Sequence, residues 1–498
     1  MSKDKRKGFI IGFIIFLVIF IIGLIRKELQ NDTFYTIKVG ESIFKNGIDM
    51  LDHFSIHEGL PYTYPHWLYD CIIYLIYKVG SFTGIYISTI ILYTILVLMV
   101  FITSKKITNN LSVAAFSTFI CTISVCGFAT ARAQLVSFII FATEVYFIES
   151  YLISSKKRYL FGLLFLSVLL CNMHVAVWPF YFVLYLPYIA EYIIALICNK
   201  IKLKKENKFI KFLKRKFILE KNSNIKYLIL TMFLSVFTGF ITPIKDTPYT
   251  YIIKTMMGNS QKYIEEHQTI TWLTSPFTII MAIETIFLTF FNKAKLRDFF
   301  MICGLVLMSI ISIRHMALLG LIGTICFARV FDLFFLNFSF NIDEPIINFF
   351  QKKKVLIPAF LIVIIFTTLM TLHNYKSPYI REELYPIKAV EYIKENLDVN
   401  NMRLYNEYNY GSYILLNDIK VFIDSRADLY TKEFNHKDDI FDDYYYIGLH
   451  HELTLNKYKI THLLLPKEGN DIRNKIVNDK NYELLYEDEN FEVYKKNS

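Results

Sequence analysis

The chain is poor in the features that hold small secreted domains or metal-binding domains together. It has seven cysteines in 498 residues, and no two of them have the Cys-x-x-Cys spacing typical of metal sites. None lies within residues 372–498, so no disulfide framework is predicted there, and the thiols are interpreted as free and buried. The cysteines are Cys71, Cys121, Cys126, Cys171, Cys198, Cys303 and Cys326.

Long polar stretches are also scarce, and long apolar runs recur instead. Hydrophobic residues make up 54% of the chain and aromatic residues 17%. A soluble chain of this length would alternate apolar and polar residues within roughly two or three domains. The run from Phe9 to Ile25 carries no charge and approaches the roughly 20 residues that a helix needs to cross a bilayer. The pattern predicts a multi-pass α-helical membrane protein.

About eleven apolar segments are predicted to be transmembrane helices. Basic residues between Lys3 and Lys7 precede the first segment, and no small-residue cleavage site follows it. This segment is therefore interpreted as an uncleaved signal anchor. The predicted spans are residues 9–25, 84–103, 111–127, 135–153, 159–173, 176–198, 227–244, 276–292, 299–313, 316–335 and 355–371.

Lys and Arg fall mainly in alternate connections between these segments. Residues 401–498 carry 13 Lys and Arg against 18 Asp and Glu, so the remainder holds an excess of 15 positive charges. Because cytoplasmic loops are enriched in Lys and Arg, this placement predicts a cytoplasmic N-terminus and an outer segment after residue 371. Trp67, Trp178 and Trp272 fall at or beside the predicted outer side, as interfacial anchors do. The protein is expected in the cell membrane, and its charge is not attributed to nucleic acid.

Beyond residue 371 the sequence changes from apolar runs to short mixed segments. The chain is therefore divided into a transmembrane domain, residues 1–371, and a small extracytoplasmic α/β domain, residues 372–498. The transmembrane domain includes a long outer loop, residues 26–83. Periodicity in the C-terminal domain predicts helices at 385–397 and 470–478, strands at 403–407, 420–424 and 462–465, and a terminal hairpin at 482–486 and 491–494.

Acidic, imidazole and guanidinium groups gather at one depth, the predicted outer ends of the helices. A carboxylate there can accept a proton from an attacking hydroxyl, and cationic groups can hold a phosphate leaving group. A donor that meets an enzyme at this depth is a lipid-linked phosphosugar, whose tail lies among membrane lipids. The residues concerned are Asp32, His66, Asp70, Arg132, His174, Glu265, Glu266, His267, Arg314 and His315.

The loop NDTFYTIKVGESIFKNGIDMLDHFSIHEGLPYTYPHWLYDC, which begins at Asn31, resembles the opening of GT-C glycosyltransferases. These membrane enzymes use polyprenyl-phosphate donors on the outer face. The resemblance implies two interfacial helices, the first at residues 35–47. It also implies that Asp32 is the acidic residue after the first helix, which acts as base or substrate ligand. His66, in Pro65-His66-Trp67-Leu68, would be the basic residue that meets lipid phosphate.

More closely, nearly the whole chain resembles a group of bacterial GT-C-like multi-pass membrane proteins. Many members have His-Glu-Trp-Leu where this chain has Pro-His-Trp-Leu, and many GT-C enzymes have a second acid where Thr33 follows Asp32. A metal-binding pair is therefore not predicted; no cofactor is assigned, and a divalent metal is left open. The matching motifs are Asp52-His53-Phe54-Ser55, His66-Trp67-Leu68, Arg132-Ala133-Gln134, Asn172-Met173-His174, Arg314-His315, and residues 406–413 and 421–430.

The leading hypothesis is an inverting glycosyltransferase of cell-envelope polysaccharide biosynthesis. It would move a sugar from a polyprenyl-phosphate to an extracytoplasmic glycan, lipid or protein. Asp32 would be the base, and the substrate-binding residues would be His66, Arg132, Arg314, His315, His174, Asp52 and Glu265.

Two other functions stay open. A polysaccharide polymerase or ligase would also use outer arginines, but these enzymes usually lack the acid after the first helix and a large C-terminal module. A non-catalytic glycan or lipid transporter, or a subunit of an envelope complex, is the third hypothesis. A transporter should place charged residues near mid-membrane, where the spans show few.

Each candidate residue also has a structural interpretation. Arg132 and Arg314 could extend their side chains to the outer interface, and His174 could be a hydrogen-bonded core histidine. Asp52 could cap the turn of its loop. A group of charged residues at Asp424, Arg426 and Asp428 could form an internal ion-pair scaffold or recognise the acceptor.

Overall fold

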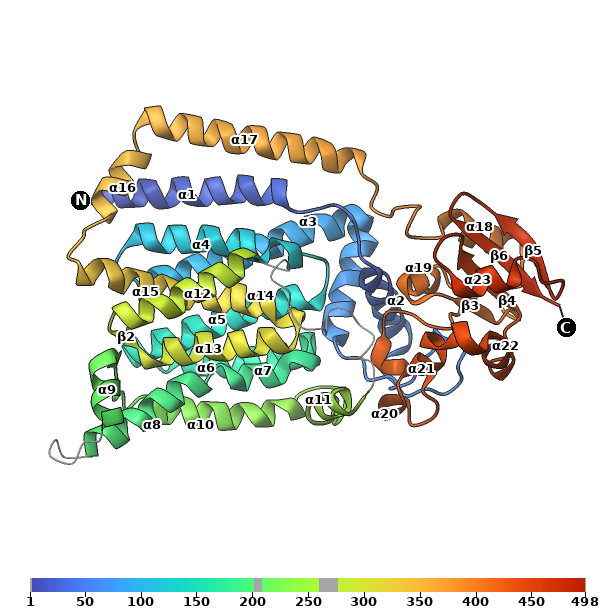
Figure 1. Ribbon diagram of the computed structural model, residues 1–498, viewed down its shortest axis with the longest axis horizontal. Coiled ribbons are helices and arrows are strands. Elements are labelled where there is room, and N and C mark those ends of the chain that lie inside the picture. Colours follow the sequence, from blue (N-terminus) through green and yellow to red (C-terminus); the bar gives the residue numbers. More distant parts are fainter. Residues whose placement is uncertain (1, 201–207, 259–275, 498) are drawn as a thin grey trace. The chain divides into compact units, whose positions relative to one another are not determined.

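The computed structural model describes residues 2–200, 208–258 and 276–497 (Figure 1). The chain divides into two compact units. Unit 1 contains Met1–Arg26, Ile87–Thr242 and Glu265–Lys376, and unit 2 contains Lys27–Tyr86, Pro243–Ile264 and Ser377–Ser498. Unit 2 therefore combines most of the predicted outer loop with the predicted C-terminal domain.

Unit 1 is built almost entirely from helices. Its one pair of described strands, β1 (Phe217–Ile218) and β2 (Ala294–Lys295), is parallel and two residues long. The helices are α1 (Lys3–Leu24), the end of α3 (Trp67–Ile107), α4 (Leu111–Val125), α5 (Ala133–Ser154), α6 (Arg158–Met173), α7 (Trp178–Val183), α8 (Leu186–Lys200), α9 (Lys208–Lys216), α10 (Ile225–Val236), α12 (Pro276–Phe291), α13 (Leu296–Ile311), α14 (Met316–Leu318), α15 (Thr324–Asn337), α16 (Asp343–Phe350) and α17 (Lys353–Lys376). Short 3-10 or π turns extend several of them: η1 (Cys126–Phe128), η2 (Val175–Val177), η4 (Phe237–Phe240), η7 (Ile313–His315) and η8 (Leu319–Gly323).

The length and hydropathy of these helices make the chain an α-helical, membrane-embedded protein. Within the described residues, seven helical segments are long and apolar enough to cross a membrane. They are Lys3–Leu24, Trp67–Ile107, Leu111–Phe128, Ala133–Ser154, Val175–Asn199, Ile313–Asn337 and Lys353–Lys376. The other four predicted spans coincide with shorter helices, α6, α10, α12 and α13, so the number of eleven stays a prediction.

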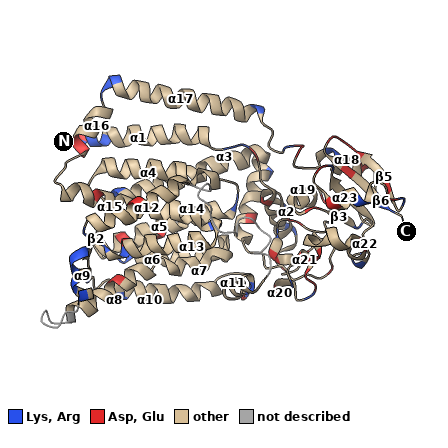
Figure 2. Cartoon of the chain, viewed as in Figure 1, with Lys and Arg blue, Asp and Glu red and all other residues tan. Residues whose placement is uncertain are grey.

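Lys and Arg gather at one end of unit 1. Figure 2 shows them where α1 and α17 begin and along α9, while the middle of most helices carries few charges. This is the distribution that a cytoplasmic end of a membrane bundle has. The sidedness of the protein itself stays a prediction.

Two buried carboxylates hold the start of α4 at this end. Asp332 accepts hydrogen bonds from the backbone N–H groups of Asn109, at 2.9 Å, and Asn110, at 3.0 Å. Asp343 accepts from the N–H groups of Leu111, at 3.0 Å, and Ser112, at 2.8 Å. The first N–H groups of a helix have no partner within the helix and carry partial positive charge, so carboxylates stabilise them. These contacts join α15 and α16 to α4.

A buried ion network joins α5, α8, α13 and α15. Arg297 donates to Glu149 at 3.2 Å, to Glu191 at 3.0 Å and to Glu220 at 2.9 Å. Arg329 lies 2.5 Å from Glu149 and donates to Asp298 at 3.1 Å. Arg297 lies between two predicted spans, residues 276–292 and 299–313, but its side chain is only 5% exposed. Buried charges of this kind must be paired, because the interior cannot replace water around them.

Unit 2 contains a four-stranded sheet in the order β3-β4-β6-β5. β3 (Leu404–Asn406) and β4 (His462–Pro466) are parallel, whereas β6 (Phe491–Lys496) is antiparallel to both β4 and β5 (Tyr482–Glu487). The predicted strands at 403–407 and 462–465 and the terminal hairpin are confirmed. The remaining elements are α2 (Asn31–Asn46), the start of α3, α11 (Thr247–Met257), α18 (Ile387–Asn396), α19 (Tyr408–Leu416), η9 (Ala427–Tyr430), α20 (Lys432–Asn435), α21 (Ile440–Tyr445), α22 (Ile447–Lys457) and α23 (Asp471–Ile476).

The predicted strand at 420–424 is wrong, because this segment pairs with the outer loop at one position only. Ser55 and Val421 form an isolated parallel bridge, in which Ile56 donates its N–H to the Val421 carbonyl at 2.9 Å. The His57 side chain lies 2.8 Å from the Phe422 carbonyl, which accepts its Nε2–H. Burial lowers the pKa of His57 to about 4, so its imidazole is neutral near pH 7.

Helix α2 is amphipathic and packs its apolar face inside unit 2. Phe34 makes edge contacts with Tyr385 and Tyr413, at ring-centroid distances of 5.1 and 5.5 Å. On another face, Gly40 lies against the first turn of α3, where a Cβ atom would come within 2.2 Å of the Asp70 carbonyl oxygen. Only glycine allows this approach. The contact fixes the spacing between the middle of α2 and the start of α3.

Candidate functional site

A chain of three hydrogen-bonded side chains lies where α2 meets the start of α3. His66 precedes α3, and its Nδ1 lies 2.6 Å from Oδ1 of Asp70, one helical turn later. Its Nε2 lies 2.8 Å from the hydroxyl of Tyr35 on α2. The Asp70 side chain is fully buried and that of His66 is 10% exposed. When Asp70 is ionised, it can accept the Nδ1–H. A neutral ring then accepts the Tyr35 proton at Nε2, whereas a protonated ring donates through both nitrogens.

Asp32 lies on the same helix as Tyr35, one turn nearer its start. Residues three apart on a helix are neighbours on one face, so the carboxylate of Asp32 is adjacent to this chain of side chains. Burial, together with the charges of Asp32 and Glu28, raises the pKa of Tyr385. Asp32 is half-buried, in contrast to Asp70.

The arrangement supplies a partly accessible carboxylate, Asp32, one helical turn from Tyr35, and Tyr35 contacts an imidazole, His66, that is paired with Asp70. The carboxylate can accept a proton, and the imidazole, when protonated, can donate one or bind an anion. Asp32 and His66 are predicted from the sequence as site residues, whereas the contacts of Tyr35 and Asp70 with His66 are not. The signal for Asp70 was present in the sequence, because residues four apart at a helix start can form a side-chain pair.

Asp52 takes part in a different contact, a buried ion cluster. Its Oδ1 accepts from Nη1 of Arg426 at 2.6 Å, and its Oδ2 accepts from the Ser55 hydroxyl at 2.5 Å. Arg426 also makes a bidentate pair with Asp424, at 2.9 and 2.7 Å. Burial opposes ionisation of Asp52, but the Arg426 charge and the Ser55 hydrogen bonds together hold its pKa below the usual range. Both oxygens of Asp52 are thus used within the protein.

This cluster also decides between two interpretations of the charged residues after 420. The side chains of Asp424 and Arg426 are 0% and 3% exposed, and Tyr430 donates its hydroxyl proton to Asp424 at 2.6 Å. Asp428 accepts a hydrogen bond from the Tyr251 hydroxyl of α11. For Asp424 and Arg426 these contacts favour an internal scaffold, since buried and paired groups are not accessible to an acceptor. Asp428 is only partly buried.

Four other predicted residues lie in unit 1, at turns that come close together. Arg132 immediately precedes α5, and Ser137, in the next turn of α5, contacts Nδ1 of His174 at 2.9 Å. Six residues after His174, the ring of Phe180 lies 5.2 Å from that of His315, which follows Arg314 in η7. The turns at 132, 174 and 314 therefore form one end of unit 1, as the sequence analysis expects.

The structure does not describe every predicted site residue. Glu265 lies outside the described residues, as do Glu266, His267 and Trp272. Asp32, Asp52 and His66 belong to unit 2, whereas Arg132, His174, Arg314 and His315 belong to unit 1. Among the described residues, no group of three or more His, Cys, Asp or Glu side chains is arranged to hold a metal ion.

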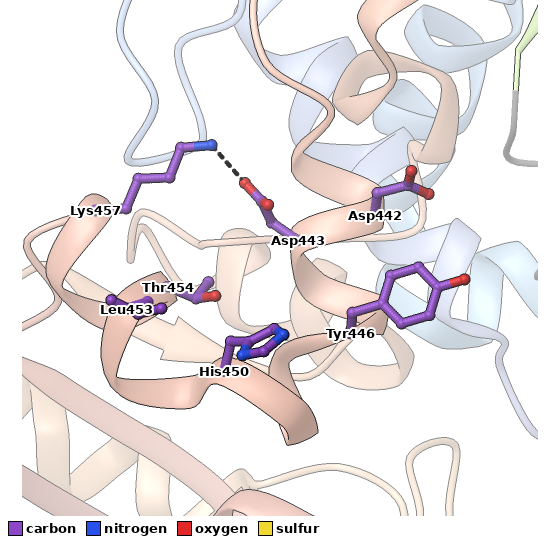
Figure 3. A pocket seen from close by; sticks show the side chains of 7 residues that line it. All are labelled: Asp442, Asp443, Tyr446, His450, Leu453, Thr454 and Lys457. Atoms are coloured by element: carbon purple, nitrogen blue, oxygen red, sulfur yellow. Dashed lines mark hydrogen bonds and ion pairs between the residues drawn. The ribbon is translucent and has the colours of Figure 1, made fainter.

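A shallow pocket of about 260 Å³ lies between α21 and α22 of unit 2 (Figure 3). Lys457 donates to Asp443 at 2.6 Å across one side of the pocket. The pocket contains none of the predicted site residues, so it is not assigned to the chemistry of Asp32 and His66. Its lining residues are Asp442, Asp443, Tyr446, His450, Leu453, Thr454 and Lys457.

Comparison with known proteins leaves the site to be interpreted from its own geometry. No family model matches the chain, and no curated protein matches it.

Proposed function

We propose that the protein is a membrane glycosyltransferase that moves a sugar from a polyprenyl-phosphate donor to an extracytoplasmic acceptor of the cell envelope, with inversion. One observation carries this proposal. Asp32, the residue assigned as base, lies one helical turn from Tyr35, which is hydrogen-bonded to His66, and His66 is supported by Asp70. A proton acceptor beside a supported imidazole is what single displacement at a sugar phosphate requires.

In the proposed reaction, Asp32 accepts the proton of the acceptor hydroxyl as its oxygen attacks the anomeric carbon of the donor sugar. The bond between that carbon and the phosphate oxygen breaks, and the electron pair leaves with the polyprenyl phosphate. His66 binds the phosphate and stabilises its added charge, and Arg132 and Arg314 keep the substrate-binding role that the sequence predicts for them. His174, His315 and Glu265 complete the substrate-binding set, whereas Asp52 holds the loop through Arg426.

The membrane context of the proposal follows from the charge distribution. The basic end of unit 1 would face the cytoplasm, so the opposite end, with Arg132, His174 and Arg314, would face outwards. A lipid-linked donor reaches this depth without leaving the bilayer. The proposed location is the plasma membrane, with residues 372–498 outside.

The direct test is a transfer assay with the full-length protein in liposomes that contain polyprenyl-phosphate sugars. We expect release of polyprenyl phosphate together with transfer of sugar to envelope glycan or lipid extracts, and an inverted anomeric configuration in the product. Separate reactions with different sugar donors would identify the substrate. Absence of both products with every donor, from protein whose folding is verified by its thermal unfolding, would overturn the proposal.

The contacts of His66 give a second prediction, which rests on the proposed function. Asp70→Asn should lower the turnover number by about 10²-fold with little change in the KM for donor, because asparagine no longer favours the protonated imidazole. The alkaline limb of the pH–rate profile should move to lower pH. Asp70→Glu should restore part of the rate.

Tyr35→Phe tests the other end of the same contact, with Tyr74→Phe as its control. Tyr74 lies on α3 and contacts Phe44 at a ring-centroid distance of 5.6 Å. We expect slower turnover for Tyr35→Phe alone. A wild-type pH profile and rate in both Asp70→Asn and Tyr35→Phe would show that the three side chains only support the fold.

One observation favours the transporter as a second candidate. Glu144 lies in the middle of α5, whereas the sequence analysis expects few charges at that depth. A flux assay of labelled polyprenyl-linked sugar across the same liposomes, without acceptor, separates the two functions. Flux without transfer would support the transporter.

A further inference from the structure

Glu144 is a buried acid that none of the proposed chemistry uses. It occupies the middle of α5 (Ala133–Ser154), and its exposed fraction is 0%. Neither of its carboxyl oxygens has a hydrogen-bond partner among the described residues. No charged side chain in the described part of the chain interacts with it electrostatically. The carboxyl group is therefore held in an apolar, dry environment within a membrane-spanning helix.

Among the described residues, the titratable groups that face Glu144 from other elements are two tyrosines, Tyr181 of α7 and Tyr185, which precedes α8. Tyr181 donates its hydroxyl proton to the Leu163 carbonyl of α6 at 2.6 Å. Tyr185 therefore donates to the Tyr181 oxygen, 3.0 Å away. Both hydroxyl protons are therefore used in hydrogen bonds, and the tyrosine oxygens can only accept a further one. Lone pairs suit the O–H of a carboxylic acid and repel a carboxylate.

A second buried glutamate on the same helix is paired with positive charges. Glu149, five residues later, is also buried, but it contacts Arg297 at 3.2 Å and Arg329 at 2.5 Å. Tyr188 donates a further hydrogen bond to it at 3.0 Å. Positive charges on two sides make Glu149 a carboxylate. Glu144 has no such partner among the described residues, and leaving an unpaired carboxylate in a membrane interior costs several kcal/mol or more.

From this contrast we propose that Glu144 carries a proton, so that α5 holds a proton-binding site in the membrane core. The ligand is a proton, and the site lies among α5, α6 and α7. This inference does not depend on the proposed glycosyl transfer, because it uses none of the residues assigned to that reaction. In either an enzyme or a transporter, such a group can exchange its proton when the bundle opens to water.

The deciding measurement is the infrared spectrum of the full-length protein, recorded for wild type and for Glu144→Gln near pH 7. The difference should show the loss of one C=O stretch of a protonated carboxylic acid, and this band should shift in D₂O. Loss of carboxylate bands instead would overturn the proposal. Glu149→Gln is the matched control, for which carboxylate bands should be lost.

Chemical labelling gives an independent readout of the same group. In its reaction with the apolar reagent dicyclohexylcarbodiimide, a protonated carboxyl transfers its proton to one nitrogen while its oxygen bonds to the central carbon. The adduct rearranges to a stable N-acylurea without a leaving group. Mass spectrometry should find the adduct on Glu144 and not on Glu149, and Glu144→Gln should remove it. Labelling of Glu149 in preference to Glu144 would contradict the proposal.

Discussion

Asp32→Asn should abolish sugar transfer while the protein remains folded and membrane-inserted. Asparagine has nearly the same shape but cannot accept the proton of the acceptor hydroxyl at the start of α2. Positioned proton acceptors typically contribute about 10²–10⁴-fold to rate, so we expect a turnover number reduced by at least this range. Binding of the polyprenyl-phosphate donor should change much less. The measurement is single-turnover transfer in liposomes, with donor affinity determined separately.

Glu28→Gln is the matched control for this substitution. Glu28 lies four residues before Asp32, is also acidic, and forms an ion pair with Arg381 at 2.6 Å. Both side chains of this pair are partly exposed to solvent, so its loss should cost less than about 1 kcal/mol and leave transfer intact. If Asp32→Asn keeps full activity, Asp32 is not the base. Loss of activity in His66→Gln alone would then assign the base to the imidazole.

Arg426→Met should strongly destabilise the protein, although Arg426 lies far along the sequence from the loop that it holds. The substitution keeps an apolar stem but leaves the carboxylates of Asp52 and Asp424 buried without a counter-charge. Removing one partner of a buried ion pair typically costs about 3–5 kcal/mol. Thermal unfolding of the full-length protein in detergent should show a lower transition temperature. Hydrogen exchange should increase at residues 52–57 and 421–430.

The pH dependence distinguishes lost charge from lost packing in this variant. In the wild type the pKa of Asp52 is lower in the folded state than in the unfolded state, where it is roughly 4. Asp52 therefore stabilises the fold above that pH, and this stabilisation is lost as pH falls. Without Arg426, burial raises the pKa of Asp52. The free-energy cost of its buried charge then appears as pH rises above the unfolded-state pKa. The difference in stability between variant and wild type should therefore shrink on acidification.

Two further variants control this prediction. Arg381→Met removes an exposed arginine of the same unit and should cost less than about 1 kcal/mol. The triple variant Asp52→Asn, Asp424→Asn, Arg426→Met removes all three charges and should recover much of the stability. Equal stability of Arg426→Met and Arg381→Met would contradict a buried ion cluster.

Part of the candidate site follows from local sequence. Asp32 and His66 are predicted from their positions, an acid after the first apolar run and a histidine before the second, and their roles stay a prediction. The side-chain pair of His66 and Asp70 is also local, because a helix places residues four apart on one face. The contact of His66 with Tyr35 depends instead on the approach of α2 to α3 at Gly40, which no periodicity predicts.

The sequence by itself determined that this is a helical membrane protein. The length and hydropathy of each segment decide whether it lies in lipid or in water, and neither property depends on the neighbouring segments. It also determined the terminal hairpin, whose strands are adjacent in the chain. Only the tertiary structure decided which charges are paired. Asp52 meets Arg426, and Glu149 meets Arg297 and Arg329, across large distances in sequence, while Glu144 on the same helix meets no charge among the described residues. Burial makes such pairing obligatory but does not specify the partner, which packing alone selects.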